Sequence, residues 1–416
     1  MDRDALRVDA ARLLRRLDAL AEIGAIDGPE GSRGSARLAL TDADRAGRDL
    51  VVTWMGDLGL DVAVDAIGNV VATRPGTNPT LPPVMTGSHI DTVATGGRYD
   101  GNLGVLAGLE VVETLEQHGI ETRHPLAVGF FTNEEGARFQ PDMLGSLVYA
   151  GGLPLEEALD IADGQGATVG ADLARIGYAG PVPCPAATRP HAFVELHIEQ
   201  GPVLESEGLR IGVVTGVQGI SWQEITVTGR SNHAGTTPMA VRHDAAYVAA
   251  DLAVFVRAVA LELGGHQVAT VGHINVRPNL VNVVPADATI TVDLRNTDEA
   301  VLRDAERRLA ERCDVLAVRE GVTIQCRRLA RFEPVAFDPA LTDLVEATAH
   351  RLGHTTLRLP AGAGHDAQML ARLCPAGMVF TPSVKGISHN PAEHTDPADL
   401  AAGADVLLQV LLALAG

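Results

Sequence analysis

The spacing of apolar residues along the chain outlines its helices and strands. A first helix is predicted where apolar residues recur at helical spacing, at Val8, Ala11, Leu14, Leu17 and Leu20. A second helix is expected to begin at Thr41 or Asp42, because both residues are good N-caps, and to end at Gly59.

Two short β-rich runs and then a strand-helix-strand unit follow the second helix. The two β-rich runs flank a Gly68-Asn69 turn, at 62–64 and 70–73. The following pattern predicts a strand at 83–86, a helix at 102–118 and a continuously apolar strand at 126–132. This order is a βαβ unit of a parallel sheet, so ligand-binding residues are expected just after the carboxyl ends of its strands.

The order of elements changes between 222 and 331. Strands are predicted at 223–228, 269–276, 289–294 and 322–328, and helices at 245–263 and 299–312. This β-α-β-β-α-β order is ferredoxin-like. Helices at 341–352 and 367–373 and a strand at 378–381 then resume the first pattern. We therefore expect an α/β domain formed by residues 1–215 and 334–416, with an α+β domain of residues 216–333 inserted into it.

Composition and charge narrow the class of partner. The chain has 416 residues and a formal net charge of −20, which would repel nucleic acids and anionic membrane surfaces. The most apolar run, 406–416, contains Gln409 and is shorter than the roughly 20 residues of a membrane span. Asp2, Arg3, Asp4 and Arg7 do not form the start of a secretory signal. We expect a cytoplasmic protein with no membrane or nucleic-acid partner.

The four cysteines are expected to be reduced packing residues. Cys184, Cys313, Cys326 and Cys374 are widely spaced and contain no Cys-x-x-Cys motif. This spacing indicates neither a disulfide framework nor a thiolate zinc site.

Histidines and acids gather next to predicted strand ends. These candidates are His89 and Asp91 in one motif, Asp100 in a glycine-rich loop, the Glu134-Glu135 pair, His197 among acids, and His389. Taken singly, each has an ordinary alternative: Asp91 as a solvated turn residue, Asp100 as an N-cap, the glutamates in a solvated loop, and the histidines at the surface or in the core. In extended backbone Glu134 and Glu135 would face opposite ways, so that one binds a metal and the other faces the substrate. Together, imidazole and carboxylate suit zinc, manganese, cobalt or nickel, and a shared aspartate could bridge two ions.

Nine motifs in order resemble the hydantoinase/carbamoylase amidases, a group of dinuclear metal amidohydrolases. They are GSHIDTV (87–93), GGRYDGNLGVLAGLE (96–110), NEEGARF (133–139), ELHIEQGPVLE (195–205), GRSNHAGTTPM (229–239), NVVP (282–285), DLR (293–295), GAGHDA (362–367) and SHNPAEHT (388–395). The resemblance implies an aminopeptidase-like catalytic domain for two metal ions, with the inserted ferredoxin-like domain serving as a lid and dimerisation domain.

The resemblance also implies a role for each metal-site residue. His89, Asp100 and His197 would hold one divalent ion, and Asp100, Glu135 and His389 the second. The ions would be Zn²⁺, with Mn²⁺, Co²⁺ and Ni²⁺ as alternatives. Glu134 would be the general base that removes a proton from the attacking water, whose pKa the two ions lower, and Asp91 would orient His89.

Further residues match substrate-side positions of the family. His233 would donate a hydrogen bond to the developing oxyanion. Asn282 and Arg295 would bind the substrate's α-carboxylate, for which an Arg side chain has suitable geometry. Gln200 and His365 would also face the substrate. Without the resemblance, His233 would be interpreted as a loop histidine and Arg295 as half of an ion pair. The resemblance also implies closure of the lid over the site and a homodimer. The helix at 245–263 offers an apolar face for dimerisation, although this face could instead cover the sheet of its own domain.

The reaction that these features imply is hydrolysis of an N-carbamoyl-L-amino acid to the amino acid, CO2 and ammonia. Allantoate and β-ureido acids are alternative substrates. Exopeptidase activity is a more distant alternative reaction. A metal-free scaffold protein is a competing class, but all five ligands and Glu134 are present. An NAD-linked oxidoreductase is excluded because no Gly-x-Gly-x-x-Gly follows the first strand.

Overall fold

A computed structural model describes residues 5–416 and divides the chain into two compact units. The first unit combines the chain up to Gly216 with Ala336–Gly416, and the second is Val217–Val335. Asp2, Arg3 and Asp4, which entered the expectation about a secretory signal, lie outside the described residues.

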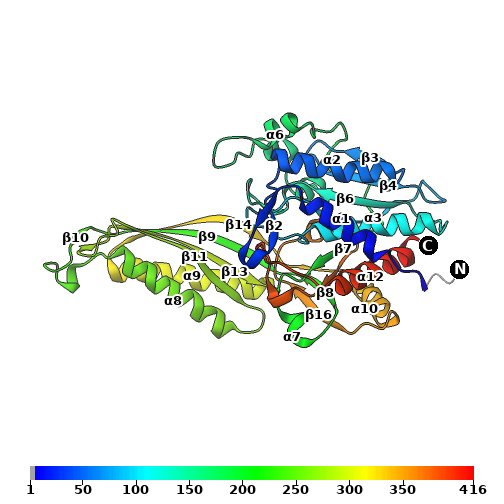
Figure 1. The fold of residues 1–416 in the computed structure, drawn as a ribbon. Helices are drawn as coiled ribbons and strands as arrows, with labels where there is room; N and C mark the ends of the chain where they lie inside the picture. The colour runs from blue at the N-terminus through cyan, green and yellow to red at the C-terminus, as the bar shows by residue number, and fades with distance from the viewer. Residues whose placement is uncertain (1–4) are drawn as a thin grey trace. The chain divides into compact units, whose positions relative to one another are not determined.

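The first unit is built on a nine-stranded mixed sheet (Figure 1). Its strands are β3 (Asp61–Val64), β4 (Val70–Arg74), β5 (Val84–His89), β6 (Leu126–Phe131), β7 (Ala192–Ile198), β8 (Ile211–Val217), β15 (Val335–Ala336), β16 (Thr356–Ala361) and β17 (Ala376–Thr381). The strand order is β15-β8-β17-β7-β5-β6-β4-β3, and β16 pairs with β8. The four central strands, from β17 to β6, are parallel to one another. A separate two-stranded sheet joins β1 (Ala25–Asp27) to β2 (Arg33–Ser35).

Helices cover this sheet. They are α1 (Ala10–Ala21), α2 (Asp42–Asp57), α3 (Asn102–Gln117), α4 (Leu144–Tyr149), α5 (Leu155–Leu159), α6 (Val169–Ile176), α7 (Val203–Glu207), α10 (Pro339–Arg351), α11 (Asp366–Leu370) and α12 (Pro397–Ala415), with short 3-10 helices η2 (Pro29–Gly31) and η4 (Val384–Gly386). Both predicted N-terminal helices are confirmed, and Thr41 caps α2 by accepting the Asp44 N–H. The helix predicted at 367–373 is shorter and begins one residue earlier, as α11.

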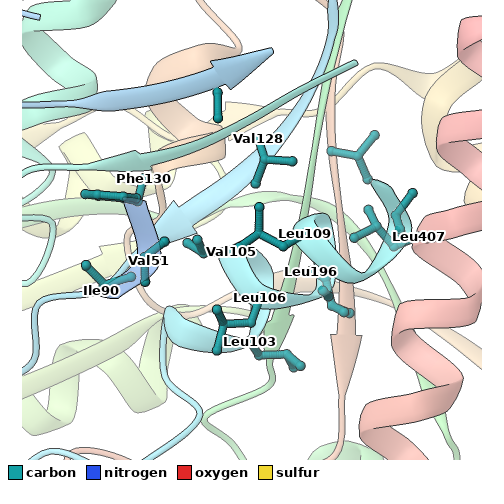
Figure 2. Close-up of a cluster of buried hydrophobic side chains, with 14 of the residues drawn as sticks. Val51, Ile90, Leu103, Val105, Leu106, Leu109, Val128, Phe130, Leu196 and Leu407 are labelled. Carbon is teal, nitrogen blue, oxygen red and sulfur yellow. The ribbon is translucent and has the colours of Figure 1, made fainter. Parts of the chain in front are cut away.

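The predicted βαβ unit is β5-α3-β6, and it contains the centre of the core. Helix α3 packs against β5, β6 and β7 of the sheet and against α1 and α12, and α12 also packs against β5, β7 and β17. Figure 2 shows side chains of α3, among them Leu106 and Leu109, gathered with Val128, Leu196 and Leu407. All five of these side chains are fully buried. Burial of apolar area between α3, the sheet and its neighbouring helices holds the turn that precedes α3 in a fixed position.

The apolar C-terminal run is part of a longer helix than predicted. Helix α12 has 19 residues and a mean hydropathy of 1.7, so by length and composition alone it is sufficient to cross a membrane. The expectation that this segment is too short was therefore wrong. Two-thirds of the helix is buried inside the protein, however, and Gln409 donates a hydrogen bond to the Leu6 carbonyl at 3.0 Å. These contacts are those of a core helix in the first unit.

The second unit has the predicted β-α-β-β-α-β order. Its elements are β9 (Gly219–Thr228), β10 (Asn232–His233), η3 (Met239–Val241), α8 (Ala245–Leu263), β11 (Val268–Arg277), β12 (Val283–Val284), β13 (Asp287–Asn296), α9 (Glu299–Glu320) and β14 (Thr323–Phe332). The main sheet is antiparallel with the order β11-β13-β9-β14, and α8 and α9 cover one of its faces (Figure 1). Helix α9 extends eight residues beyond the predicted end at 312, because Cys313 and Leu316 continue its buried stripe until Gly321 ends it in a left-handed conformation.

Candidate active site

Five of the predicted side chains meet at the carboxyl ends of the parallel strands. His89 is the last residue of β5, and His197 lies near the end of β7. Glu134 and Glu135 follow β6, and His389 follows β17. This is the edge of a parallel sheet at which ligand sites form. It lies wholly in the first unit.

Asp100 lies between two groups of possible metal ligands. Its Oδ1 is 3.6 Å from His89 Nε2 and 3.2 Å from His197 Nε2. Its Oδ2 is 3.4 Å from His389 Nε2, which is itself 3.1 Å from Glu135 Oε2. The ligand atoms of each triad lie within 4.8 Å of one another. The two oxygens of one carboxylate thus face two different triads, which is the geometry of a bridging ligand.

The two buried imidazoles of the first triad are oriented by backbone carbonyls. His89 Nδ1 lies 2.9 Å from the Asp91 carbonyl oxygen, and His197 Nδ1 lies 2.8 Å from that of Ile198. A carbonyl can only accept, so both Nδ1 atoms donate, and Nε2 is the ring atom that each imidazole presents to Asp100 or to a metal ion. This is the arrangement of metal-binding histidines.

The turn before α3 positions Asp100. The N-cap of α3 is Gly101, with a left-handed φ of 66°, so the alternative of Asp100 as the N-cap is wrong. A Cβ at Gly101 would lie 2.4 Å from the His89 ring. Glycine is therefore required at this position by both the backbone conformation and the close approach of the imidazole.

Glu134 and Glu135 were expected in extended backbone, but they lie in a turn. Asn133 has a left-handed φ of 55°, which reverses the chain directly after β6. The two carboxylates still separate: Glu134 Oε2 is 3.3 Å from His89 Nε2, and Glu135 is bound to His389. The carboxylate of Asp91 accepts the backbone N–H groups of Glu134 and Glu135 at 3.3 and 3.4 Å. Asp91 accepts from His89 Nδ1 through its carbonyl, and its carboxylate Oδ1 lies 3.9 Å from the same atom while also holding this turn.

Acidic groups outnumber basic ones at this edge of the sheet. Burial raises the pKa of Asp91 to about 6, and it raises the pKa of Glu134 and of Asp366 well above their ordinary values. In Asp100, burial is outweighed by hydrogen bonds from His197, His389 and His89, which hold its pKa well below the ordinary value. Hydrogen bonds to the same carboxylates raise the pKa of His389 to about 10. Buried carboxylates beside imidazole nitrogens are the donor set that divalent transition-metal ions and zinc prefer. The residues present therefore fit such ions.

A third group, Glu195, His197 and His365, is also close enough to hold an ion. Two of its three members are already engaged, however. Glu195 accepts hydrogen bonds from Ser88 Oγ at 2.6 Å and from the Ala367 N–H at 2.8 Å. His197 donates a hydrogen bond from Nδ1 to the Ile198 carbonyl, and its Nε2 faces Asp100. Glu195 thus joins β5, β7 and α11 beneath the two triads, which is a positioning contact.

Two predicted substrate-side residues lie at the same edge of the sheet. Gln200 donates from Nε2 to Asp100 Oδ2 at 2.9 Å, and its Oε1 has no hydrogen-bond partner among residues 5–416. His365 is buried, and its ring stacks edge-on against His197 with 4.5 Å between centroids. Burial lowers the pKa of His365 well below its ordinary value, so it is neutral, and neither ring nitrogen is hydrogen-bonded within the described part of the chain.

The other three predicted substrate residues lie in the second unit. His233 is exposed, and its Nδ1 accepts the N–H groups of Gly235 and Thr236 at 3.0 and 3.2 Å. Its proton is therefore on Nε2. The Asn282 carbonyl accepts the Ala234 N–H, which holds Asn282 close to the His233 loop. Arg295 forms a bidentate ion pair with Asp293, with distances of 2.9 to 3.1 Å.

Glu393 and Ser388 were not identified from the sequence. Glu393 is buried and accepts the N–H groups of Tyr99 and Asp100, and Ser388 Oγ lies 3.0 Å from its second oxygen. A Cβ at Gly97 would lie 2.0 Å from the Glu393 carboxyl group, so glycine is required there. Glu393 is part of the SHNPAEHT motif, which is the only signal that the sequence offers for it.

Comparison with known proteins identifies the family of this chain. Residues 85–413 match the family model described as Peptidase family M20/M25/M40. An N-carbamoyl-L-amino-acid amidohydrolase of Rhizobium meliloti is 44% identical over 98% of this chain and 96% of its own length. A ureidoglycolate hydrolase of Arabidopsis thaliana is 35% identical over 99% of this chain and 87% of its own length.

Solved structures give the same result. A hydantoinase/carbamoylase family amidase of Burkholderia multivorans has a TM-score of 0.91 and 47% identity, with 99% of each chain covered. Aminopeptidase PepT of Bacillus cereus has a TM-score of 0.68 and 16% identity, with 98% of this chain and all of its own chain covered, and shares the fold. The predicted aminopeptidase-like α/β fold is thereby confirmed. The chain belongs to peptidase family M20/M25/M40, and within it to the hydantoinase/carbamoylase family of amidases.

Proposed function

We propose that this amidase hydrolyses the ureido C–N bond of an N-carbamoyl-L-amino acid, releasing the amino acid, CO2 and ammonia. The observation that carries the proposal is the position of Asp100, whose two oxygens face two triads of metal-binding side chains. The names of the similar amidohydrolases support the choice of substrate.

Two divalent ions would be held by the two triads. His89, Asp100 and His197 would hold the first ion, and Asp100, Glu135 and His389 the second. Zn²⁺ suits this set of ligands best, and Mn²⁺, Co²⁺ and Ni²⁺ suit it as well. When bound, such ions polarise a carbonyl oxygen and lower the pKa of water.

Glu134 is the general base in this proposal. Burial raises the pKa of its carboxyl group. A carboxylate with a raised pKa is a stronger base, which suits proton transfer near neutral pH. The backbone of Glu134 is fixed by the carboxylate of Asp91. Glu134 accepts a proton from the attacking water and returns it to the leaving nitrogen, so that it ends the cycle in its starting form.

The second unit supplies three of the groups that bind substrate, and the first unit supplies two. The Nε2–H of His233 faces solvent and can donate to the oxygen that becomes negative as the carbonyl is attacked. Arg295 and Asn282 bind the α-carboxylate. The guanidinium is planar, and its ion pair with Asp293 fixes its orientation, so it suits a planar anion. In the first unit, Gln200 accepts a substrate N–H through Oε1, and the neutral His365 is the second group that faces the substrate. The second unit then acts as a lid.

The chain is proposed to work as a cytoplasmic homodimer through its second unit. Strand β11 is an edge strand of the antiparallel sheet, and Val268 and Ile274 on it are exposed. An unpaired sheet edge with exposed apolar side chains is a surface on which a second copy can add its own strand. Tyr247 and Val254 of α8 are exposed, whereas the opposite face of that helix covers its own sheet.

Ammonia release tests the proposed reaction. The metal-loaded protein is offered N-carbamoyl-L- and D-amino acids, N-carbamoyl-β-alanine and allantoate, with ureidoglycolate added because two curated relatives are named for it. The proposal predicts release from the L-amino-acid derivatives and none with Glu134→Gln. Release from allantoate, ureidoglycolate or the β-alanine derivative alone would assign the corresponding alternative. Silence on every compound with metal bound would favour an exopeptidase, which a panel of dipeptides tests.

A further inference from the structure

Two thiols of the second unit lie in contact. The sulfur atoms of Cys313 and Cys326 are 4.0 Å apart, although the residues are 13 positions apart in the chain. Cys313 is on the buried stripe of α9, and Cys326 is on the edge strand β14. Cys313 is 4% exposed, whereas Cys326 is exposed to solvent. One sulfur is therefore open to a reagent and the other lies directly behind it.

The surroundings make Cys326 more reactive than the other three cysteines, since the pKa of Cys313 is itself raised by its hydrogen bond with Cys326. The hydrogen bond with Cys313 lowers the pKa of Cys326 to about 7, so a large share of this sulfur is thiolate at neutral pH. Burial raises the pKa of Cys374 to about 12, and burial also raises that of Cys184. Thiolate is the reactive form of cysteine, so Cys184 and Cys374 serve as internal controls.

We propose that Cys313 and Cys326 form an oxidation site that peroxide converts into a reversible disulfide. The Cys326 sulfur attacks one oxygen of hydrogen peroxide, the O–O bond breaks, and Cys326 sulfenic acid and water are formed. The Cys313 sulfur then attacks the sulfenic sulfur, the S–O bond breaks, and a second water leaves. Two thiols lose two electrons and two protons, and one peroxide is reduced to two waters. The sulfur atoms need to approach by about 2 Å to reach the S–S bond length.

The disulfide would join the edge strand of the sheet to the helix behind it. Strand β14 pairs with β9 on one side, and β9 is its sole neighbour in the sheet as described. A covalent link between α9 and β14 restricts the unfolded chain, so the oxidised second unit is expected to resist unfolding better than the reduced one. The site is independent of the proposed amidase reaction, whose metal-binding residues are in the first unit.

Mass spectrometry of the full chain tests this proposal. After graded hydrogen peroxide, the protein is alkylated under denaturing conditions. Oxidised wild type is expected to take up alkyl groups on Cys184 and Cys374 only, to yield a linked peptide pair containing Cys313 and Cys326, and to regain both thiols with dithiothreitol. Cys326→Ser should abolish this product, and Cys374→Ser, the matched control, should retain it. In Cys313→Ser, Cys326 should instead gain oxygen atoms, because no second thiol lies behind it.

Three results would overturn the proposal. Wild-type Cys326 could gain oxygen without forming the linked pair, Cys184 or Cys374 could be oxidised as readily as Cys326, or the disulfide could join two chains. Unfolding supplies a second readout, in which the oxidised wild type unfolds at a higher urea concentration than the reduced form, while peroxide leaves the midpoint of Cys326→Ser unchanged.

Discussion

Glu393 and Asp100 are joined in two ways. Glu393 Oε1 accepts the backbone N–H of Asp100 at 3.2 Å. Ser388 Oγ lies 3.0 Å from Glu393 Oε2 and 3.1 Å from Asp100 Oδ2. Ser388 immediately precedes His389, so this network connects both ends of the second triad. Glu393 thereby determines how the shared carboxylate and the histidine face each other.

Replacing Glu393 by alanine should weaken metal binding. The loss leaves the Tyr99 and Asp100 N–H groups without their acceptor and frees the turn that carries His389. Loss of such a supporting contact typically costs about 10–100-fold in metal affinity, and we expect a loss of this size, measured by competition with a fluorescent chelator.

Glu393→Gln should retain most of the affinity, because an amide oxygen can still accept the two N–H groups. Asp65→Ala is the matched control. Asp65 is also buried and also accepts two backbone N–H groups, those of Ile67 and Asn69, but it does not contact either triad. Equal losses of metal affinity in Glu393→Ala and Asp65→Ala would show that Glu393 has no specific effect on the metal site.

Arg295→Lys should weaken binding of a carboxylate substrate. A lysine cannot reproduce the bidentate geometry that Asp293 fixes. We expect KM to rise by about tenfold or more, the equivalent of one charge-assisted hydrogen bond, with a much smaller change in kcat. Arg327→Lys is the control, because Arg327 pairs with Glu224 on the same sheet. An unchanged KM in Arg295→Lys would remove Arg295 from the substrate site.

Asp405 should make stability depend on pH. Burial raises its pKa to about 6, although it accepts the Val8 N–H and lies near Arg7. The folded state then binds a proton more tightly than the unfolded state, so this residue lowers stability as pH rises from about 4 to about 6. Asp405→Asn should therefore stabilise the protein at pH 7.5 by about 1 kcal/mol, a figure discounted for partial exposure, and should have no effect near pH 3.5. Urea unfolding of both proteins across this range provides the comparison, and a constant difference would contradict the assignment.

Arg37 should contribute strongly to stability. Its guanidinium is fully buried, and its five hydrogen bonds end on the Leu20, Ile23 and Ile90 carbonyls, Ser35 Oγ and Asn102 Oδ1. Arg37→Lys leaves several of these acceptors unpaired, and we expect the free energy of unfolding to fall by about 3 kcal/mol. Arg33→Lys, at an exposed pair with Glu22, should cost less than about 0.5 kcal/mol. Similar losses in both variants would refute this account of Arg37.

Local patterns predicted most of the fold because they reflect local physics. The unbroken apolar strand at 126–132 and the N-cap at Thr41 each specify their element without reference to the rest of the chain. The predicted ligands come together because the motifs containing His89, Glu135 and His197 follow neighbouring parallel strands. Their roles as metal ligands remain predictions.

Contacts between distant residues could not be predicted in this way. Glu393 acts on the backbone of a residue 293 positions away, and Cys313 meets Cys326 only because α9 packs behind β14. The turn that contains Glu134 and Glu135 depends on the left-handed conformation of Asn133. The pattern of apolar and polar residues does not predict that conformation. Such features depend on tertiary packing, which a linear pattern does not contain.

Metal content per chain tests the central claim, that Asp100 is shared by two ions. Each variant is reconstituted with Zn²⁺, passed through a desalting column and analysed by inductively coupled plasma mass spectrometry. We expect two ions in wild type, one in His389→Ala, and none in Asp100→Ala, since both triads lose a ligand. A single ion in the wild type, or any tightly bound ion in folded Asp100→Ala, would contradict the central claim.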